Sequence, residues 1–485
     1  MMDGLELTGD QRRALDAMRS GRNILLTGDA GTGKSFVLDA YLEEAERRGR
    51  NVIAMAPTGV AALNLRNGST IHRTLDLKPE FQDPDMPLGA PKPVLKTAEV
   101  IVIDEFSMCR VDLFERVIRM ILDAEKVSCH KQIILVGDPF QLPPVVTGRD
   151  EAAMIDRYQS TTGYCFTSPF FRGLRLEPHI LHEVVRQRGD VGLSRMLNLA
   201  RSGDERCVSY FNQHALLSKD DAPEDAIWLC PTNRAVSEMN ARRLEQIDSR
   251  PYEFRAKGEG EITGADKATD DNLVLKVGAR VMTVANDAEL GYANGSLGTV
   301  LCVNPRADKP VTIAFDNGII ASVGYKTWEI LKSVVEETDE TDEDGVKVTR
   351  VRSEVVGRFT QIPVRLAWAV TIHKAQGKSF ESVCVDSRVF ANGQLYVALS
   401  RCTSFDGLYV YPRIKPRCLA VDEVVTNFYD SVVLAEKELE DGIHNSVRLL
   451  GNHPDSSGEE IIAVPKDMIN SVLTLLRQNG ITISF

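Results

Sequence analysis

The sequence predicts an α/β protein that contains two parallel-sheet units, with a small β-barrel inserted into the second. Short apolar runs rich in β-branched residues alternate with helical patterns up to about residue 177, and again between residues 227 and 401. This alternation is typical of parallel strands joined by helices. Between the halves of the second unit, short strand-like runs are punctuated by glycine, which favours a barrel. At 485 residues the chain is too long for one hydrophobic core, so about three domains are expected.

The first unit is expected to hold buried strands with helices between them. The strands are continuous apolar runs, at Asn23–Leu26, Asn51–Ala56, Val100–Ile103 and Gln132–Val136. Helices of this unit are expected near Ser35–Arg47 and Val111–Ala124. In the second unit we expect a strand and then a turn over 227–233, a strand at Ser382–Val385, and helices at Ala235–Gln246 and Ala391–Arg401.

The insert extends from about Pro251 to Arg358 and contains runs such as VGARVMTVAND and NGSLGTVLCV. Within it, residues 336–344 (EETDETDED) include seven acidic residues and no apolar residue. Such a run is expected to be a solvated loop or a hairpin tip.

Composition excludes several classes of protein. Hydrophobic residues make up 43% and charged residues 26%, as in soluble globular proteins, and no apolar run approaches the roughly 20 residues of a membrane-spanning helix. The first residues lack the features of a signal or transit peptide, so we expect a cytoplasmic protein. Nine scattered cysteines without metal-ligand spacing are expected to be reduced. The net charge of −12 disfavours a generally basic surface, so any polyanion must bind in a local groove.

A glycine-rich loop follows the first strand and begins the first helix after it. Its pattern Gly28-x-x-x-x-Gly33-Lys34-Ser35 places backbone N–H groups around the phosphates of a nucleotide. Lys34 supplies a positive charge for the β- and γ-phosphates, and Ser35 supplies a hydroxyl for Mg²⁺. The loop therefore predicts a nucleoside triphosphate site.

Further polar residues follow other predicted strands. Asp104 can hold the shell of the metal, and Glu105 can orient and deprotonate the attacking water. Gln141 follows the fourth strand and has an amide that could sense the γ-phosphate. Arg186 and Arg401 are assigned to the second unit, where they would reach the transition state only when a cleft between the units closes. These residues predict nucleotide hydrolysis that is coupled to movement of the two units.

A series of motifs occurs in order between about residues 5 and 410. They are LTGDQ (7–11), GDAGTGKS (28–35), APTGVAALNL with STIH (56–65 and 69–72), VIDEFSM (102–108), GDPFQLPPV (137–145), VVRQ (184–187), PTN (231–233), TIHKAQGKSFESV (371–383) and QLYVALSR (394–401). Together they resemble the superfamily 1B DNA helicases. The resemblance is greatest to the Pif-type (petite integration frequency) helicases, with RecD-like and Dda-like helicases as near neighbours.

The resemblance implies two RecA-like P-loop domains with ATP between them, a small insertion in the first and an SH3-like β-barrel inserted in the second. The implied domains are residues 1–178 for the first RecA-like domain, with a strand-separating wedge at 73–98; 179–247 and 364–435 for the second; 248–363 for the barrel, with its acidic loop at 336–344; and 436–485 for a C-terminal extension of unknown role. We expect the extension to begin as an acidic linker and to continue as strand, helix and strand.

The resemblance also implies roles for single residues. The catalytic residues would be Lys34, Asp104, Glu105, Gln141, Arg186 and Arg401. ATP would be held by Gln11 at the adenine, by Gly28, Ala30, Gly31, Thr32, Gly33, Lys34 and Ser35 at the phosphates, and by Gln376 and Gly377, which would couple the nucleotide to DNA. Mg²⁺ would be held by Ser35 and Asp104, partly through water. Single-stranded DNA would be bound, without base reading, by Thr58, Gly59, Thr70, His72, Thr371, His373 and Lys374.

The implied function is that of an ATP-dependent helicase that moves 5′ to 3′ on single-stranded DNA and unwinds tailed duplexes in replication, repair and recombination. G-quadruplexes and RNA–DNA hybrids are further candidate substrates. We expect a monomer in solution, associated with the nucleoid of a bacterial or phage-type system. The direction of movement rests on the resemblance alone.

Two alternative functions stay open. The first is an ATP-driven translocase or remodeller without strand separation, since the segment 73–98 departs from the usual Pif-type wording. The second is a regulatory P-loop module that uses nucleotide only as a switch. The complete set of catalytic residue types disfavours the second alternative, because that set would be idle in a switch.

Overall fold

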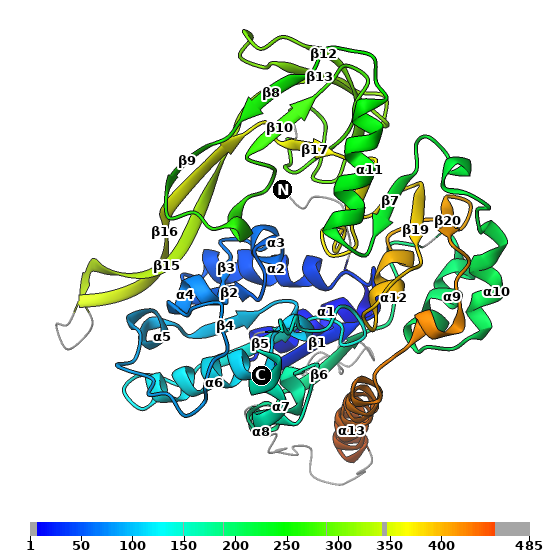
Figure 1. Ribbon diagram of the computed structural model, residues 1–485. Coiled ribbons are helices and arrows are strands. Elements are labelled where there is room, and N and C mark those ends of the chain that lie inside the picture. Colours follow the sequence, from blue (N-terminus) through cyan, green and yellow to red (C-terminus); the bar gives the residue numbers. More distant parts are fainter. Residues whose placement is uncertain (1–6, 149, 188, 288, 342–346, 452–485) are drawn as a thin grey trace.

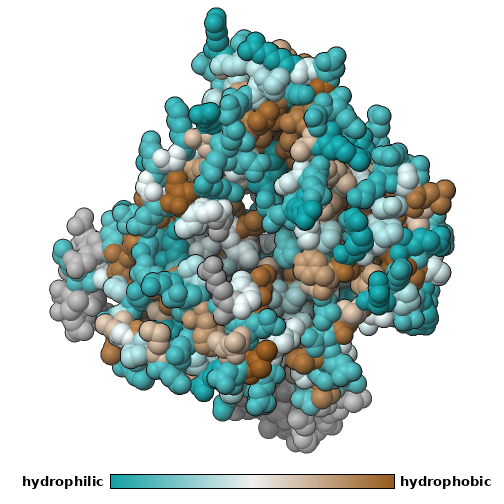
Figure 2. Space-filling view, viewed as in Figure 1, coloured by the Kyte–Doolittle hydropathy of each residue, from teal (hydrophilic) through white to brown (hydrophobic). Residues whose placement is uncertain are grey.

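The structure is a computed structural model that describes residues 7–148, 150–187, 189–287, 289–341 and 347–451. Two α/β units lie side by side, and a β-rich insert lies above them with a long hairpin that reaches the first unit (Figure 1). The face drawn in Figure 2 is largely hydrophilic, with a hollow near its centre, where the insert and the two α/β units meet. No helix among the described residues is long and apolar enough to cross a membrane.

The first unit is built on a six-stranded parallel sheet with the order β3-β2-β4-β5-β1-β6. Its strands are β1 (Ile24–Gly28), β2 (Val52–Ala56), β3 (Ser69–Thr70), β4 (Val100–Ile103), β5 (Gln132–Val136) and β6 (Glu177–Leu181). Its helices are α1 (Gly9–Arg19), α2 (Lys34–Arg47), α3 (Gly59–Asn64), α4 (Ile71–Leu75), α5 (Pro93–Thr97), α6 (Val111–Glu125), α7 (Glu151–Tyr158) and α8 (Pro169–Gly173). The α/β architecture predicted from the sequence is confirmed.

The four inner strands of this sheet, β2, β4, β5 and β1, are largely apolar because helices cover both of its faces. Ile24 and Leu26 pack in one core with α1 and α2, whereas Leu25 packs in a second core with α6. Successive side chains of a strand point to opposite faces, so each strand must supply apolar residues to both layers. The expected end of this unit at residue 178 is wrong, because β6 pairs with β1 and extends the sheet to Leu181.

The segment that was expected to form the wedge lies along α6. Gln82 donates its backbone N–H to Asp112 (2.7 Å), and Arg116 donates to the carbonyls of Met86 and Pro87 (2.6 and 2.7 Å). Between α4 and α5 this stretch has no helix or strand among its described residues. Its role in strand separation stays a prediction.

The second unit contains a four-stranded parallel sheet with the order β18-β7-β19-β20. Its strands are β7 (Ile227–Cys230), β18 (Ala369–Thr371), β19 (Val383–Asp386) and β20 (Leu408–Tyr411), and its helices are α9 (Val191–Arg201), α10 (Arg206–Phe211), α11 (Asn233–Glu245) and α12 (Gln394–Leu399). The helix α12 begins at Gly393, whose φ of +72° suits glycine. A Cβ at Gly393 would lie 2.3 Å from the carbonyl oxygen of Phe140 in the first unit, so the start of α12 packs directly against that backbone.

The insert between α11 and β18 is antiparallel. Its main sheet has the order β14-β13-β12-β11-β17, and β8 pairs with β10. These strands are β8 (Tyr252–Arg255), β10 (Asn272–Leu275), β11 (Arg280–Thr283), β12 (Leu297–Val303), β13 (Val311–Phe315), β14 (Ile320–Val323) and β17 (Val364–Leu366). Their apolar residues pack into one hydrophobic core, as they would in an independent β domain.

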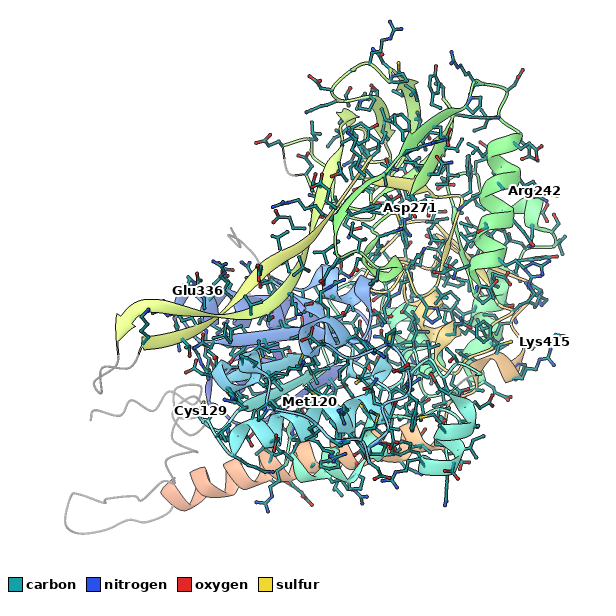
Figure 3. All side chains as sticks on the ribbon, turned by 60° about the vertical axis from the view of Figure 1, so that its left-hand side comes forward. Met120, Cys129, Arg242, Asp271, Glu336 and Lys415 are labelled. Carbon is teal, nitrogen blue, oxygen red and sulfur yellow. The ribbon has the colours of Figure 1, made fainter. Side chains whose placement is uncertain are left out.

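A long hairpin of β15 (Lys326–Thr341) and β16 (Lys347–Gln361), joined by β9 (Lys257–Gly260), extends from the insert to the first unit (Figure 3). Ser69 donates its hydroxyl to the carbonyl of Leu331 (3.0 Å), and Asn51 accepts the backbone N–H of Val351 (2.8 Å). Arg73 forms a two-pronged ion pair with Asp266. Residues 336–341 of the acidic run form the distal part of β15, which agrees with the hairpin alternative and not with a loop, whereas 342–344 lie outside the described residues.

The chain then returns to the first unit through α13 (Glu423–Gly451). Phe428 stacks on Phe166 with ring centroids 4.1 Å apart, and Val425 and Val432 join the core beneath the first sheet. Two expectations are therefore wrong. The second unit does not extend to residue 435, and the chain from 436 to 451 is helical, not a linker. The strand, helix and strand expected further along fall in 452–485, outside the described residues.

Candidate functional site

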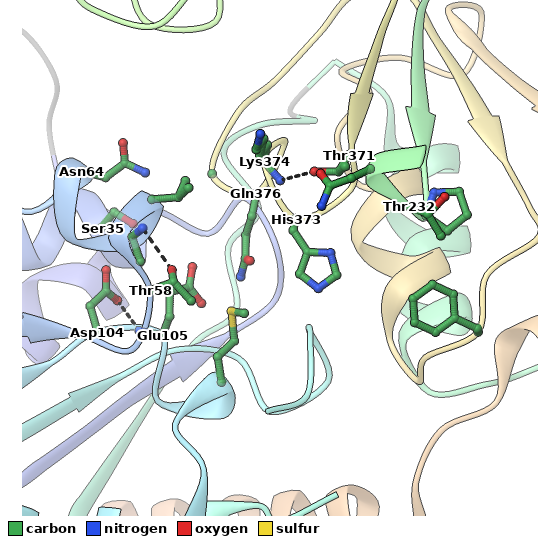
Figure 4. A pocket seen from close by; sticks show the side chains of 17 residues that line it. Ser35, Thr58, Asn64, Asp104, Glu105, Thr232, Thr371, His373, Lys374 and Gln376 are labelled. Carbon is green, nitrogen blue, oxygen red and sulfur yellow. Dashed lines mark hydrogen bonds between the residues drawn. The ribbon is translucent and has the colours of Figure 1, made fainter. Parts of the chain in front are cut away.

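A cavity of about 500 Å³ lies between the two parallel sheets (Figure 4). The first unit contributes Ser35 of α2 and residues that follow β2 and β4, and the second contributes residues that follow β7, β18 and β19. The predicted site residues that line it are Ser35, Thr58, Asp104, Glu105, Thr371, His373, Lys374, Gln376 and Gly377. The structure thus brings predicted nucleotide residues and predicted DNA residues into one cavity.

The glycine-rich loop has the geometry that its sequence requires. Gly31 has a φ of +87°, and a Cβ there would lie 2.7 Å from the Cβ of Arg186. Lys34 donates its ammonium group to the carbonyls of Gly28 and Asp29 (2.8 and 2.9 Å), so it lies across the loop. Burial lowers the pKa of Lys34.

Gln11 supports this loop from α1. Its amide nitrogen donates to the carbonyl of Thr32 (2.8 Å), and its amide oxygen accepts the backbone N–H of Thr8 (3.0 Å). Thr8 in turn caps the N-terminus of α1, so Gln11 is fixed by a reciprocal capping box. The structure places Gln11 beside the phosphate-binding loop, and its contact with adenine stays a prediction.

Asp104 and Glu105 follow β4 and face the cavity. Burial raises the pKa of both carboxyl groups, and the charge of Asp104 raises the pKa of Glu105 further. Glu105 has a φ of +51°, in the left-handed region that a side chain other than glycine rarely adopts. Such local strain persists where the surrounding structure enforces it, and it is frequent at functional sites.

Two amide side chains connect the units across the cleft. Gln376, which follows β18, donates to the amide oxygen of Gln141, which follows β5 (3.1 Å). Both side chains are buried. A direct bond between these glutamines is the kind of contact through which a change on one side of the cleft can be sensed on the other.

The two candidate finger arginines lie at different places. Arg401 is 2% exposed and donates to the carbonyl of Val397 (2.8 Å) and to the hydroxyl of Ser400 (2.7 Å). Arg186 donates its side chain to the carbonyl of Ser400 (3.2 Å) and its backbone N–H to Gly31 (3.2 Å). The assignment of Arg186 to the second unit is therefore wrong, because it lies in the connection after β6 and contacts the phosphate-binding loop. Burial of Arg401 and the positive charge of Arg186 lower the pKa of Arg401 to about 9.

A buried ionic network that the sequence did not reveal lies beside the loop. Arg201 pairs with Asp138 (2.9 Å) and Asp29 (3.2 Å), and its guanidinium carbon lies 4.2 and 4.4 Å from the ring centroids of Phe140 and Tyr429, which contact each other. The two carboxylates raise the pKa of Arg201 above its ordinary value against the effect of burial. Asp29 and Asp138 are within the sequence motifs, but Arg201 is in no motif.

The predicted DNA residues form two groups. Thr58, Thr371, His373 and Lys374 line the cavity, whereas Gly59 is buried at the start of α3 and Thr70 and His72 lie at α4. The three threonines share one local role, because the hydroxyl of each accepts the backbone N–H of the residue three positions further on. Ala61 donates to Thr58, Arg73 to Thr70 and Lys374 to Thr371. Burial lowers the pKa of both histidines.

Comparisons with known proteins show which proteins this chain is similar to. Residues 6–163 match the family described as an AAA domain. The ATP-dependent DNA helicase Pif1 of Campylobacter jejuni is 28% identical over 455 residues, which cover 87% of this chain and 97% of that protein. The Pif1 helicase of a Psychrobacter species is 30% identical over 451 residues, which cover 82% of this chain and 67% of that protein.

Solved structures agree with both the fold and the arrangement of the units. Pif1 from a Bacteroides species in complex with ADP-AlF4 superposes with a TM-score of 0.75 at 27% identity, covering 88% of this chain and 97% of that one. With single-stranded DNA bound, the same helicase superposes with a TM-score of 0.61. The structure described here thus superposes better on the ADP-AlF4 complex than on the complex with single-stranded DNA. On the extent of these matches, the chain belongs to the Pif1 family of ATP-dependent DNA helicases.

Proposed function

We propose that this protein is an ATP-dependent DNA helicase that moves 5′ to 3′ along single-stranded DNA and unwinds duplex DNA in genome maintenance. The single observation that supports this most directly is the cavity between the two sheets. Ser35, the last residue of the glycine-rich motif, and the carboxylate pair line it from one side, and Thr371, His373 and Lys374 line it from the other. A movement of the two units that changes the shape of this cavity would therefore move the predicted nucleotide residues and the predicted DNA residues together.

ATP is the proposed nucleotide. Lys34 would bind its β- and γ-phosphates, with Gly28, Ala30, Gly31, Thr32 and Gly33 supplying the loop. Ser35 and Asp104 fit a divalent cation, since a hydroxyl and a carboxylate line the same cavity, and Mg²⁺ bound there would offset phosphate charge. Glu105 would orient the attacking water and remove its proton.

Closure of the cleft is proposed to complete the catalytic site. Arg186 and Arg401 would stabilise the charge of the transferring phosphoryl group, as arginine fingers do. Gln141 would sense the γ-phosphate, and Gln376 with Gly377 would transmit its presence to the DNA residues. The bond between Gln376 and Gln141 supports this assignment.

Single-stranded DNA is proposed to bind along Thr58, Gly59, Thr70, His72, Thr371, His373 and Lys374. Hydroxyl, backbone and imidazole groups suit phosphates and sugars, so binding would tolerate any sequence. Residues 73–98 are the proposed wedge, and 248–363 the barrel. G-quadruplexes and RNA–DNA hybrids are proposed further substrates, and the protein is proposed to act as a monomer at the nucleoid.

The test uses two labelled duplexes, one with a 5′ single-stranded tail and one with a 3′ tail, together with ATP and Mg²⁺. The 5′-tailed duplex should be unwound and the 3′-tailed duplex should not, with Lys34→Ala as the blank. Unwinding from the 3′ tail alone would refute the proposed direction. If neither duplex is unwound while DNA still stimulates ATP hydrolysis, the protein is a translocase without strand separation.

A further inference from the structure

An exposed aromatic ring lies in the cavity and has no role in the site described above. Phe390 lines the cavity together with Thr232 and His373, and it is 72% exposed. No other aromatic side chain among the described residues makes a ring contact with it. Core packing therefore does not explain this residue.

The loop that carries Phe390 is held in place by a buried side chain. Gln394 is fully buried; its amide oxygen accepts the backbone N–H of Phe390 (3.1 Å), and its amide nitrogen lies 3.4 Å from the carbonyl of Pro231. Pro231 follows β7 and lines the same cavity. One glutamine thus fixes the loop of Phe390 relative to the loop that follows β7.

The surroundings of the ring indicate its ligand. The same cavity offers the hydroxyl of Thr232, the imidazole of His373 and the ammonium group of Lys374. Burial lowers the pKa of Lys374, and the charge of Arg365 lowers it further, so negative charge nearby would be favourable. Aromatic rings combined with cationic and polar groups are the means by which proteins bind single strands without reading sequence, the rings for bases and the polar groups for phosphates.

We infer that Phe390 stacks on a base of the single strand bound between the two units. This inference rests on the proposed function, which it extends from the backbone to the bases of the DNA. Because every base has a π-face, such a contact adds affinity without sequence preference. A loop already fixed by Gln394 loses little conformational freedom when the base binds.

The experiment compares binding of two single strands, an oligothymidylate and a strand of the same length whose sugars carry no bases. Phe390→Ala should weaken binding of the oligothymidylate roughly 5- to 100-fold and leave binding of the baseless strand within about twofold. Phe390→Tyr should restore binding, and Phe390→Leu should not. Tyr325→Ala is the matched control, since Tyr325 is an exposed aromatic residue (52%) of the insert outside the cavity.

Each outcome decides the inference. Equal losses for both strands, or no loss for either, would refute stacking. His373→Ala separates this result from the proposed function, because loss of a phosphate contact should weaken both strands alike. If His373→Ala weakens binding and Phe390→Ala does not, only the stacking inference fails. If the wild-type protein binds neither strand, the proposed function fails and the inference fails with it.

Discussion

The hydroxyl of Tyr396 accepts the backbone N–H of Ala30 at 2.8 Å, so a side chain of the second unit binds the phosphate-binding loop of the first. Tyr396 is 3% exposed, and its hydroxyl also lies 3.5 Å from a carboxylate oxygen of Asp138. It projects from α12, the helix that ends beside Arg401. This contact therefore ties the loop to the helix that positions the candidate finger.

Tyr396→Phe should lower the maximal rate of DNA-stimulated ATP hydrolysis by about fivefold or more. The change removes the acceptor for the buried N–H group of Ala30, which costs about 1–3 kcal/mol wherever the two units are in contact as they are here. The rate should be measured at saturating ATP and DNA, with Tyr409→Phe in the second unit as the control. An unchanged rate would show that the contact does not contribute to catalysis.

Lys34→Ala should abolish turnover, because it removes the positive charge proposed for the β- and γ-phosphates. Glu105→Gln should leave ATP binding largely intact and slow hydrolysis by roughly 10²-fold or more, because an amide cannot remove a proton from water. Binding of a fluorescent ATP analogue and single-turnover hydrolysis separate the two effects. Wild-type turnover in Glu105→Gln would exclude Glu105 as the base.

Arg186→Ala and Arg401→Ala should both reduce the rate constant for hydrolysis while the affinity for ATP changes little, because a finger acts chiefly on the transition state. The two variants should differ in stability. Arg401 is buried with its donors paired, so its loss should also lower the thermal unfolding temperature, whereas loss of the half-buried Arg186 should not. Arg195→Ala, an exposed change on α9, is the control. Weaker ATP binding with an unchanged rate constant would contradict the finger role.

Binding of single-stranded DNA should weaken with salt by a slope of about −0.7 per phosphate contacted, although the whole protein has a net charge of −12. His72→Ala and His373→Ala should lower the affinity and raise the DNA concentration needed for half-maximal stimulation. Because burial lowers their pKa, both imidazoles are neutral at pH 7, and the slope should be the same at pH 7 and pH 8. A slope that is less steep at pH 8 than at pH 7 would mean that a charged histidine contributes.

The central strands of the first sheet could be predicted because each is buried on both faces and is therefore a continuous apolar run. β6 could not be predicted in this way, since its residues EPHIL include polar side chains that are tolerated at the edge of the sheet, and the sequence alone suggested a boundary there. The stretch after residue 435 resembled a linker because charged residues dominate its first positions, 436–441 (EKELED). It is helical because glutamate and lysine favour helices and the preceding turns of α13 are anchored by packing.

The predicted site residues that line the cavity could be found because each belongs to a motif that follows a strand, whereas Phe390 lies in no motif. The contacts between the two units could not be predicted from the sequence. Tyr396 and Ala30 are 366 positions apart, and Arg201 meets Asp138 and Asp29 only after α9 packs beside the first sheet. The same holds for Arg186, whose side chain and backbone bind different units. A local sequence pattern cannot reveal such contacts, since they depend on how the two complete units are placed relative to each other.

The return of α13 to the first unit has a mechanical consequence. The chain passes from the first unit to the second between Leu181 and Val191, and passes back between Tyr411 and Glu423. A body connected at one point can swing in any direction, whereas a body connected at two points turns most readily about the line that joins them. We therefore expect the cleft to open mainly about the line that joins these two crossings, so that each cycle of ATP repeats a similar movement.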